Sequence, residues 1–321
     1  MSLFRVWAER PVANKYRVLF DGIAEVVDPG PLDNPLSTLP GAHAIIASAR
    51  IRYNAALMAQ VPTLRVIART GIGIDNISLA DATAHKVMIC NTPDGPTVST
   101  AEHAITLIMA ATKHVKRGER MLGDGRKHDF FSEHNGLELD GRQLGLIGLG
   151  RIGSRVAKVM KAVGMAVAVY DPFVSPERAA ELGVTLMPNL EDVLRVADVV
   201  SVHAPLTPET KHLINAATLA QMRQGAYLVN TARGGLVDET ALIEALEAGR
   251  LQGVGLDVFD PEPPDQKNPL LHRDDVICTP HIAGATVAGK ERLWRNAIGQ
   301  ILMAFRGERP THLCNPEVWE T

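Results

Sequence analysis

Three polar side chains in separate segments of the sequence are suited to acid–base chemistry and anion binding. Arg233 follows an apolar run and precedes two glycines, which suits bidentate capture of a carboxylate. Glu262 stands between prolines that fix its backbone, and His281 comes just after another apolar run. Each has an ordinary alternative when taken alone: a surface pair of Arg233 with Asp238, a solvated loop acid and a structural histidine.

Taken together, the three side chains form a set that could reduce a carbonyl group. Hydride reduction also requires a proton, and histidine titrates near neutral pH. A neighbouring carboxylate would hold the imidazole in one orientation and favour its protonated form. We therefore predict that Glu262 supports His281 as the acid–base group and that Arg233 binds a substrate carboxylate.

A glycine-rich turn of the pattern G-x-G-x-x-G lies between an apolar strand pattern and an amphipathic helix pattern. Gly148 permits the tight turn, Gly150 lets a pyrophosphate approach the backbone, and Gly153 lets helix and strand pack closely. The amides of Arg151 and Ile152 would then face the phosphates at the start of the helix. The pattern predicts a dinucleotide site, with a bare glycine turn as the alternative.

The end of the next apolar run predicts which dinucleotide is bound. Asp171 stands there, where a carboxylate accepts hydrogen bonds from a ribose diol and repels a 2′-phosphate. No arginine immediately follows Asp171, so NAD is predicted rather than NADP. The alternative for Asp171 is a plain turn residue before a proline.

Composition narrows the class of protein. The 321 residues predict two domains, and 46% hydrophobic with 21% charged residues is the balance of a globular protein. A net charge of −3 and 4% aromatic residues argue against a nucleic acid partner. Three cysteines without metal-ligand spacing predict buried or free thiols in a reducing cytoplasm and no metal site. The sequence contains no run of 18 apolar residues, so no membrane span is predicted.

The elements that must position these residues follow an alternating pattern. Short apolar runs alternate with helix-length amphipathic segments, as in βαβ units around a parallel sheet. A long helix is predicted over Ala101–His114, capped by Ser99 or Thr100, and others over Arg151–Val163, Glu239–Ala248 and Lys290–Phe305. The predicted strands are Phe4–Ala8, Ile23–Val27, Ala44–Ala47, Arg65–Ala68, Val87–Asn91, Gln143–Gly148, Ala166–Asp171, Val184–Met187, Asp198–His203, Ala226–Thr231, Gly253–Val258 and Val276–Thr279.

Several motifs, in this order, resemble the D-isomer-specific 2-hydroxyacid dehydrogenase family, which includes phosphoglycerate dehydrogenases, glyoxylate/hydroxypyruvate reductases and D-lactate dehydrogenases. The resemblance implies an α/β fold of two doubly wound parallel-sheet domains. A flavodoxin-like substrate domain would comprise residues 1–98 and 285–321, with an inserted NAD-binding Rossmann domain over residues 99–284. The motifs that carry the resemblance are residues 69–77, 138–153, 203–207, 230–234, 257–259 and 280–284.

The resemblance also implies roles for individual residues. Arg233, Glu262 and His281 would be the catalytic set, and the backbone amides of Ile72 and Gly73 would bind the substrate carboxylate. Family members are commonly homodimers joined through the cofactor domain, and the helix Ala101–His114 is expected to contribute. Asp257 would lie near the nicotinamide carboxamide, and His281 would also lie against NAD. The implied NAD-binding residues are Gly148, Gly150, Arg151, Ile152, Gly153, Asp171, Ala204, Thr231 and Asp257.

One departure from the family pattern bears on the substrate. Phosphoglycerate dehydrogenases of this family usually carry an Arg-Ser pair soon after the strand that corresponds to Ala44–Ala47, where a phosphate is held. Here Ala47 precedes Ser48, and Arg50 and Arg52 are shifted to a position expected to be a local helix start facing solvent. Phosphoglycerate is therefore not favoured, and glyoxylate, hydroxypyruvate or pyruvate fits at least as well.

The sequence thus predicts an NAD-dependent cytoplasmic enzyme that interconverts an (R)-2-hydroxy acid and its 2-oxo acid in a cleft between two domains. An alternative from another class is an NAD(H)-responsive binding protein like the family's transcriptional corepressors, which can retain the same arginine, glutamate and histidine. Oxidation of formate or phosphite is a minor alternative, because formate enzymes of the family typically place Gln where Glu262 stands.

Overall fold

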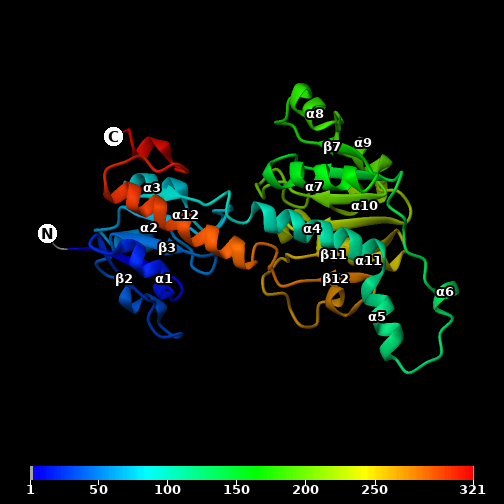
Figure 1. Ribbon diagram of the computed structural model, residues 1–321, viewed down its shortest axis with the longest axis horizontal. Coiled ribbons are helices and arrows are strands. Elements are labelled where there is room, and N and C mark those ends of the chain that lie inside the picture. Colours follow the sequence, from blue (N-terminus) through cyan, green and yellow to red (C-terminus); the bar gives the residue numbers. More distant parts are fainter. Residues whose placement is uncertain (1–2, 321) are drawn as a thin grey trace. The chain divides into compact units, whose positions relative to one another are not determined.

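The computed structural model describes residues 3–320 and divides the chain into two compact units. Unit 1 contains the chain up to Thr97 together with the chain from Ala285 onward, and unit 2 is Val98–Gly284. Each unit is built on one parallel sheet with helices packed against it (Figure 1). The predicted fold class, two α/β units with doubly wound parallel sheets, is therefore confirmed.

Unit 1 has a five-stranded sheet in the order β2-β1-β3-β4-β5, which is the flavodoxin-like arrangement. Alternate residues of its central strands enter two apolar clusters, one on each face, so both faces are buried. The strands are β1 (Phe4–Ala8), β2 (Ala24–Val27), β3 (Ala44–Ala47), β4 (Val66–Arg69) and β5 (Met88–Cys90). The helices are α1 (Asn14–Arg17), α2 (Ala55–Ala59), α3 (Leu79–Ala84) and α12 (Val287–Phe305), with 3₁₀ turns η1 (Val18–Phe20), η2 (Pro35–Thr38) and η5 (Pro316–Val318).

Helix α12 brings the end of the chain back onto the first sheet. Thr286 caps it by accepting a hydrogen bond from the Gly289 amide. Ala297, Ile298 and Ile301 are buried in the apolar cluster that also contains residues of β1, β3 and β4. Figure 1 shows this orange helix lying beside α1. The segment after residue 285 is thus part of the core of unit 1.

Unit 2 has a seven-stranded parallel sheet in the order β12-β11-β10-β9-β6-β7-β8. This is the Rossmann order, extended by one strand at an edge. The strands are β6 (Gln143–Ile147), β7 (Ala166–Tyr170), β8 (Thr185–Leu186), β9 (Val199–Val202), β10 (Ala226–Asn230), β11 (Leu251–Leu256) and β12 (Val276–Cys278). The helices are α4 (Thr97–Thr112), α5 (Val115–Gly123), α6 (Phe130–Glu133), α7 (Arg151–Ala162), α8 (Pro176–Leu182), α9 (Leu190–Val196), α10 (Ala216–Gln221) and α11 (Glu239–Glu247), with 3₁₀ turns η3 (Gly234–Leu236) and η4 (Pro269–His272).

The predicted cap of the long helix is wrong. Helix α4 begins at Thr97, so Ser99 and Thr100 lie inside its first turns and do not cap it. The chain already turns over residues 93–96, and the Thr97 hydroxyl donates to the carbonyl of Pro93 at 2.7 Å. Prolines are tolerated where a helix starts, so the helix forms directly after Pro96. The apolar side chains of α4 are packed in the core of unit 2: Ala101, Ala104, Leu107, Ile108 and Ala111.

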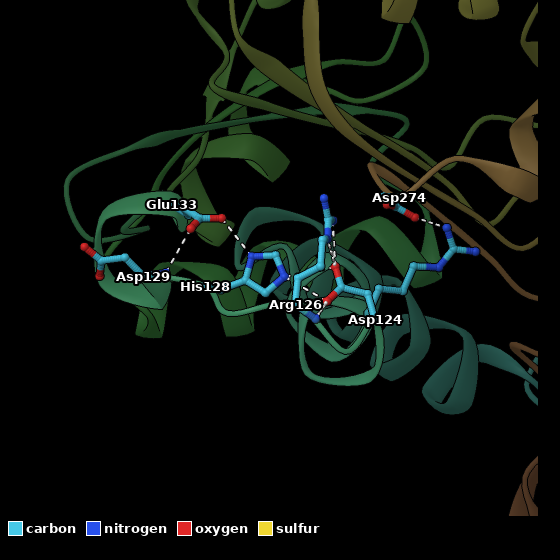
Figure 2. Close-up of polar contacts among 7 residues, drawn as sticks. Asp124, Arg126, His128, Asp129, Glu133 and Asp274 are labelled. Carbon is cyan, nitrogen blue, oxygen red and sulfur yellow. Dashed lines mark hydrogen bonds and ion pairs between the residues drawn. The ribbon is translucent and has the colours of Figure 1, made fainter.

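Residues 115–137, which we call the arm, leave the sheet of unit 2 as α5, a loop and α6 (Figure 1). The arm exposes large apolar side chains, with Phe131 97% and Leu122 77% exposed. Polar contacts organise its loop, where the ring of His128 lies between the carboxylates of Asp124 and Glu133, each at 2.9 Å (Figure 2). The arm therefore combines a polar network within its loop with several exposed apolar side chains.

Candidate active site

The glycine turn joins β6 to α7 and leaves open space at its second glycine. Gly148 has φ +97° and donates its amide to the Tyr170 carbonyl at 2.9 Å. A Cβ on Gly153 would lie 2.2 Å from the Gly148 carbonyl oxygen, whereas a Cβ on Gly150 would meet nothing within 4 Å. The turn is thus tight between helix and strand and open at Gly150, where the predicted pyrophosphate would approach. Arg151 and Ile152 form the first turn of α7 behind it.

Asp171 follows β7 and is fixed beside this turn. Its Oδ2 accepts a hydrogen bond from the Leu149 amide at 2.8 Å, and its Oδ1 accepts one from the Phe173 amide at 3.0 Å. The carboxylate thereby connects the glycine turn with the end of the neighbouring strand. Each oxygen has a second lone pair, so these bonds leave acceptor capacity for the ribose hydroxyls of the predicted role.

A half-buried histidine that sequence reasoning missed lies under the turn. Burial lowers the pKa of His203 to about 4, so its ring is neutral, and its Nε2 is 2.9 Å from Ser201 Oγ. A Cβ on Gly148 would come within 2.9 Å of the His203 carbonyl carbon and 3.0 Å of the Ala204 amide. His203 and Ala204 therefore form the floor against which the glycine turn packs.

The end of β10 carries an unsatisfied hydroxyl and the arginine loop. Thr231 is 6% exposed, and among the described residues its buried Oγ1 has no hydrogen-bond partner. Buried hydroxyls are normally paired, so this atom is suited to a bound ligand such as the predicted cofactor. Asn230 shapes the next turn, because its side chain donates to the Arg233 carbonyl at 2.8 Å and accepts from the Ala232 amide at 3.0 Å.

The structure brings Glu262 and His281 into contact, and Arg233 lies near enough for its charge to act on Glu262. His281 Nδ1 lies 2.8 Å from Glu262 Oε2, and Glu262 Oε1 accepts a hydrogen bond from the Phe259 amide at 3.1 Å. Burial raises the pKa of the Glu262 carboxyl, but the hydrogen bond and charge of His281, with a smaller effect of the Arg233 charge, hold it below 4.5. A carboxylate thus holds the Nδ1 edge of the imidazole at neutral pH.

Asp238, the other acid of the arginine loop, caps α11 by accepting hydrogen bonds from the Thr240 and Ala241 amides.

Asp257 anchors the loop that carries His281. Its side chain is fully buried at the end of β11, and it accepts hydrogen bonds from Thr279 Oγ1 at 2.6 Å and from the amides of Ile282 and Ala283, each at 2.9 Å. Burial raises the pKa of Asp257, whereas the nearby His103 and the hydrogen bonds from Thr279 and these amides lower it more. Nothing in the sequence singles out His103 or Thr279, because a lone histidine in an apolar helix and a threonine at a strand end are common.

In unit 1, Ile72 and Gly73 follow β4 at the carboxyl edge of the sheet. The Ile72 carbonyl accepts a hydrogen bond from the Asn91 side chain at 2.8 Å. Asn76 ties the same loop to the loop after β3, donating to the carbonyls of Ser48 at 3.0 Å and Ile51 at 2.7 Å. The carboxyl edge of a parallel sheet is where such folds bind ligands.

Residues 3–320 contain neither a cluster of metal-ligating side chains nor a helix suited to a membrane span. No group of three or more His, Cys, Asp or Glu side chains in this range is arranged to hold a metal ion. None of the helices described is both long and apolar enough to cross a membrane. The cysteines within the range, Cys90, Cys278 and Cys314, are free thiols, and burial raises the pKa of each.

Comparison with known proteins decides the family. Residues 105–283 match the model of the "D-isomer specific 2-hydroxyacid dehydrogenase, NAD binding domain". The chain belongs to this family. The match covers nearly all of unit 2, so the prediction of an NAD-binding Rossmann domain is confirmed.

Three proteins illustrate what this chain is similar to. D-3-phosphoglycerate dehydrogenase of Archaeoglobus fulgidus is 43% identical over 248 residues, which are 77% of this chain and 46% of that protein. A solved protein of Thermus thermophilus is 35% identical with TM-score 0.87, covering 97% of this chain and 100% of that one. D-lactate dehydrogenase of Aquifex aeolicus, solved with NAD and lactic acid, is 30% identical with TM-score 0.83, covering 97% and 99%. The chain spans about half the length of the phosphoglycerate dehydrogenases that it matches.

Proposed function

We propose that this member of the 2-hydroxyacid dehydrogenase family is an NAD-dependent enzyme that interconverts a small (R)-2-hydroxy acid and its 2-oxo acid. The observation that carries the proposal is the 2.8 Å contact of His281 Nδ1 with Glu262 Oε2. Because Nδ1 is held by a carboxylate, the opposite ring nitrogen, Nε2, is the atom available to exchange a proton with substrate. The His281 side chain is 44% exposed, which leaves it accessible.

The proposed roles divide between binding and proton transfer. Arg233 and the amides of Ile72 and Gly73 orient the substrate carboxylate. In reduction, His281 Nε2 gives its proton to the carbonyl oxygen while Glu262 holds the ring at Nδ1, and in oxidation His281 takes the proton back. NAD, when bound, supplies or accepts the hydride. The residues that would hold NAD are those of the glycine turn with Asp171, Ala204, Thr231 and Asp257; the open space at Gly150 and the orphaned Thr231 hydroxyl fit this role.

The loop after β3 bears on the size and charge of the substrate. The carboxylate of Glu9, which is 6% exposed, accepts hydrogen bonds from the Ser48 amide and hydroxyl, both at 2.6 Å. It also accepts from the amides of Arg50 at 2.9 Å and Ile51 at 3.2 Å, and from the Tyr53 hydroxyl at 2.9 Å. Several amide and hydroxyl donors that converge on one group are also suited to binding phosphate, and here they bind an internal carboxylate.

The Glu9 arrangement favours a substrate without a phosphate group. By family resemblance, the phosphate of phosphoglycerate would be held just after β3, where the donors now bind Glu9. The expected Arg-Ser pair is absent there, and the shifted Arg50 and Arg52 are exposed. We therefore propose glyoxylate, hydroxypyruvate or pyruvate as the 2-oxo acid, although the similar enzymes named above include a phosphoglycerate dehydrogenase.

We also propose that the chain forms a homodimer through unit 2. Most apolar side chains of α4 are packed in the core, whereas the arm exposes several large ones, so we place the surface offered to a second copy mainly on the arm. Val115, Leu122, Phe130 and Phe131 on the arm are 48–97% exposed, and exposed apolar patches commonly mark protein interfaces. A symmetric dimer covers the same patch on both copies, which suits a chain whose partner is itself.

An NADH absorbance assay tests the enzymatic proposal. Glyoxylate, hydroxypyruvate, pyruvate and phosphohydroxypyruvate are compared at equal concentration, and we expect kcat/KM for the best unphosphorylated acid to exceed that for phosphohydroxypyruvate by about tenfold or more. Turnover of none of them despite tight NADH binding would support the alternative, an NAD(H)-responsive binding protein. A preference for phosphohydroxypyruvate would refute the substrate assignment alone.

The substitution Glu9→Gln tests the substrate assignment directly. It removes the internal negative charge while keeping the side-chain shape, so the ratio of kcat/KM for phosphohydroxypyruvate to that for hydroxypyruvate should rise. Glu25→Gln is the matched control, because Glu25 is exposed on β2 and its removal changes the net charge equally. The same ratio in both variants would show that Glu9 does not set the preference.

A further inference from the structure

His103 lies on α4, yet its ring reaches the loop that carries His281. Its Nε2 is 2.9 Å from Thr279 Oγ1, a residue 176 positions later in the chain, and 3.5 Å from Asp257 Oδ1. The His103 side chain is 19% exposed, and that of Asp257 is fully buried. Helix α4 is thereby joined by a polar contact to the ends of β11 and β12.

The acceptor-only chemistry of a carboxylate fixes the direction of these hydrogen bonds. Thr279 Oγ1 is 2.6 Å from Asp257 Oδ1, so the hydroxyl donates to the carboxylate. His103 Nε2 must then carry a hydrogen and donate to the same hydroxyl oxygen. The result is a chain from imidazole N–H through hydroxyl to carboxylate, in which each bond polarises the next.

Asp257 in turn holds three consecutive amides of the catalytic loop. The His281 amide donates to the Asp257 carbonyl at 2.7 Å, and the Ile282 and Ala283 amides donate to its two carboxylate oxygens. His281 has φ +53°, a left-handed conformation that a residue with a side chain keeps only where its surroundings hold it. The conformation that presents the His281 ring to Glu262 therefore depends on how Asp257 is placed.

We propose that His103 is a positioning residue for proton transfer at His281, acting through Thr279 and Asp257. The inference rests on the proposed function, because it assigns His103 a part in presenting the acid–base group. Proton transfer requires the imidazole nitrogen within hydrogen-bond reach of the carbonyl oxygen, so a small displacement of the loop lowers kcat before it affects substrate binding.

The decisive variants are His103→Leu, which removes the donor, and His103→Gln, whose side-chain amide offers an N–H at similar reach. We expect His103→Leu to lower kcat by about tenfold while KM for the 2-oxo acid changes less than about twofold. His103→Gln should recover kcat to within about threefold of wild type. Thr106→Ala, an exposed position on the same helix, is the control expected to match wild type. An unchanged kcat in His103→Leu, or equal losses in the leucine and glutamine variants, would overturn the proposal.

A double-mutant cycle tests the route through the hydroxyl. Thr279→Val removes the shared hydroxyl, and Thr279→Ser keeps it. If His103 acts through Thr279, the double variant His103→Leu/Thr279→Val loses no more activity than Thr279→Val alone. Multiplied losses in the double variant would refute this route. If His103→Leu does not fold, the comparison of Thr279→Val with Thr279→Ser decides whether the hydroxyl matters.

Amide hydrogen exchange separates this inference from the proposed function. Exchange at residues 281–283 reports whether Asp257 still holds the loop, and it needs no turnover. We expect faster exchange in His103→Leu than in wild type or His103→Gln. If wild type reduces no 2-oxo acid, the proposed function fails, and faster exchange in the leucine variant still supports the positioning of the loop by His103. Equal exchange in all three proteins would overturn the positioning role even in an active enzyme.

Discussion

Adding one methyl group at Gly153 should separate the two parts of the dinucleotide turn. In Gly153→Ala the new Cβ would lie 2.2 Å from the Gly148 carbonyl oxygen and 3.2 Å from its carbon. Backbone atoms cannot rotate away as a flexible side chain can, so the first turn of α7 and the turn at Gly148 must move apart by about 1 Å. The amides of Arg151 and Ile152 then no longer point at the pyrophosphate position.

Gly153→Ala should lower both the stability of the protein and its affinity for NADH. Overpacking of this kind costs about 1–3 kcal/mol, which for a domain of 150–250 residues corresponds to about 2–4 °C in Tm per kcal/mol. Each charged hydrogen bond that is lost weakens binding by about 1.5–3 kcal/mol, so we expect NADH affinity to fall by at least about tenfold. Differential scanning calorimetry measures the first effect and NADH fluorescence titration the second.

Gly150→Ala is the matched variant because its two effects should separate. Gly150 has φ −68°, which alanine adopts without strain, and its Cβ would meet nothing within 4 Å. Its Tm should therefore stay close to wild type while NADH affinity falls, since the methyl group stands where the pyrophosphate approaches. Gly299→Ala, inside α12 with open space around it, controls for the intrinsic effect of replacing glycine. Wild-type NADH affinity in Gly150→Ala, or wild-type Tm in Gly153→Ala, would refute the reasoning.

Three further predictions concern the acid–base pair, the dimer and the arm. Glu262→Gln should lower kcat for reduction by about two- to fivefold, because the carboxylate that holds His281 Nδ1 is lost; an unchanged kcat in steady-state assays would contradict this. Phe131→Ser should shift the protein toward monomer in size-exclusion chromatography with light scattering, and an unchanged dimer would exclude this part of the arm from the interface. The pKa of His128 is raised above 6.5, first by its hydrogen bond to Glu133, so the contacts of the arm are fully present below pH 6.5 and are lost as pH rises through the raised value. Amide exchange in residues 124–133, corrected for intrinsic rates, should therefore increase between pH 6 and pH 8 in wild type but not in His128→Gln.

Most strands could be located from sequence because each is a short apolar run buried on both faces. The runs Phe4–Ala8 and Ala44–Ala47 coincide with β1 and β3, and the predicted run Gln143–Gly148 differs from β6 by one residue. Ends of elements were harder, as α4 shows, because its start depends on the turn at residues 93–96 and not on the first residue that can cap. Strand order depends on contacts between distant segments. The order of the motifs predicts it only because the motifs resemble those of a family whose fold is known.

Part of the candidate site was also predictable from the sequence. Chemically distinctive residues at the ends of apolar runs, such as Arg233 and His281, stand out because parallel strands carry their functional loops at the carboxyl edge. Glu9 and His103 do not stand out, because their importance lies in what they contact across the fold. Each side chain forms hydrogen bonds with groups that are far away in the sequence.

The sequence by itself determined the chemistry available to this protein and the turn that fits a dinucleotide, because glycine spacing and residue type are local properties. Only the tertiary structure decided that Glu262 contacts His281 and lies within the field of Arg233. The tertiary structure also decided that the Asp257 carboxylate accepts hydrogen bonds from the catalytic loop and that His103, on α4, contacts Thr279 beside it. The physical reason is that a hydrogen bond depends on distances of about 3 Å between atoms, and spacing along the chain does not specify such distances.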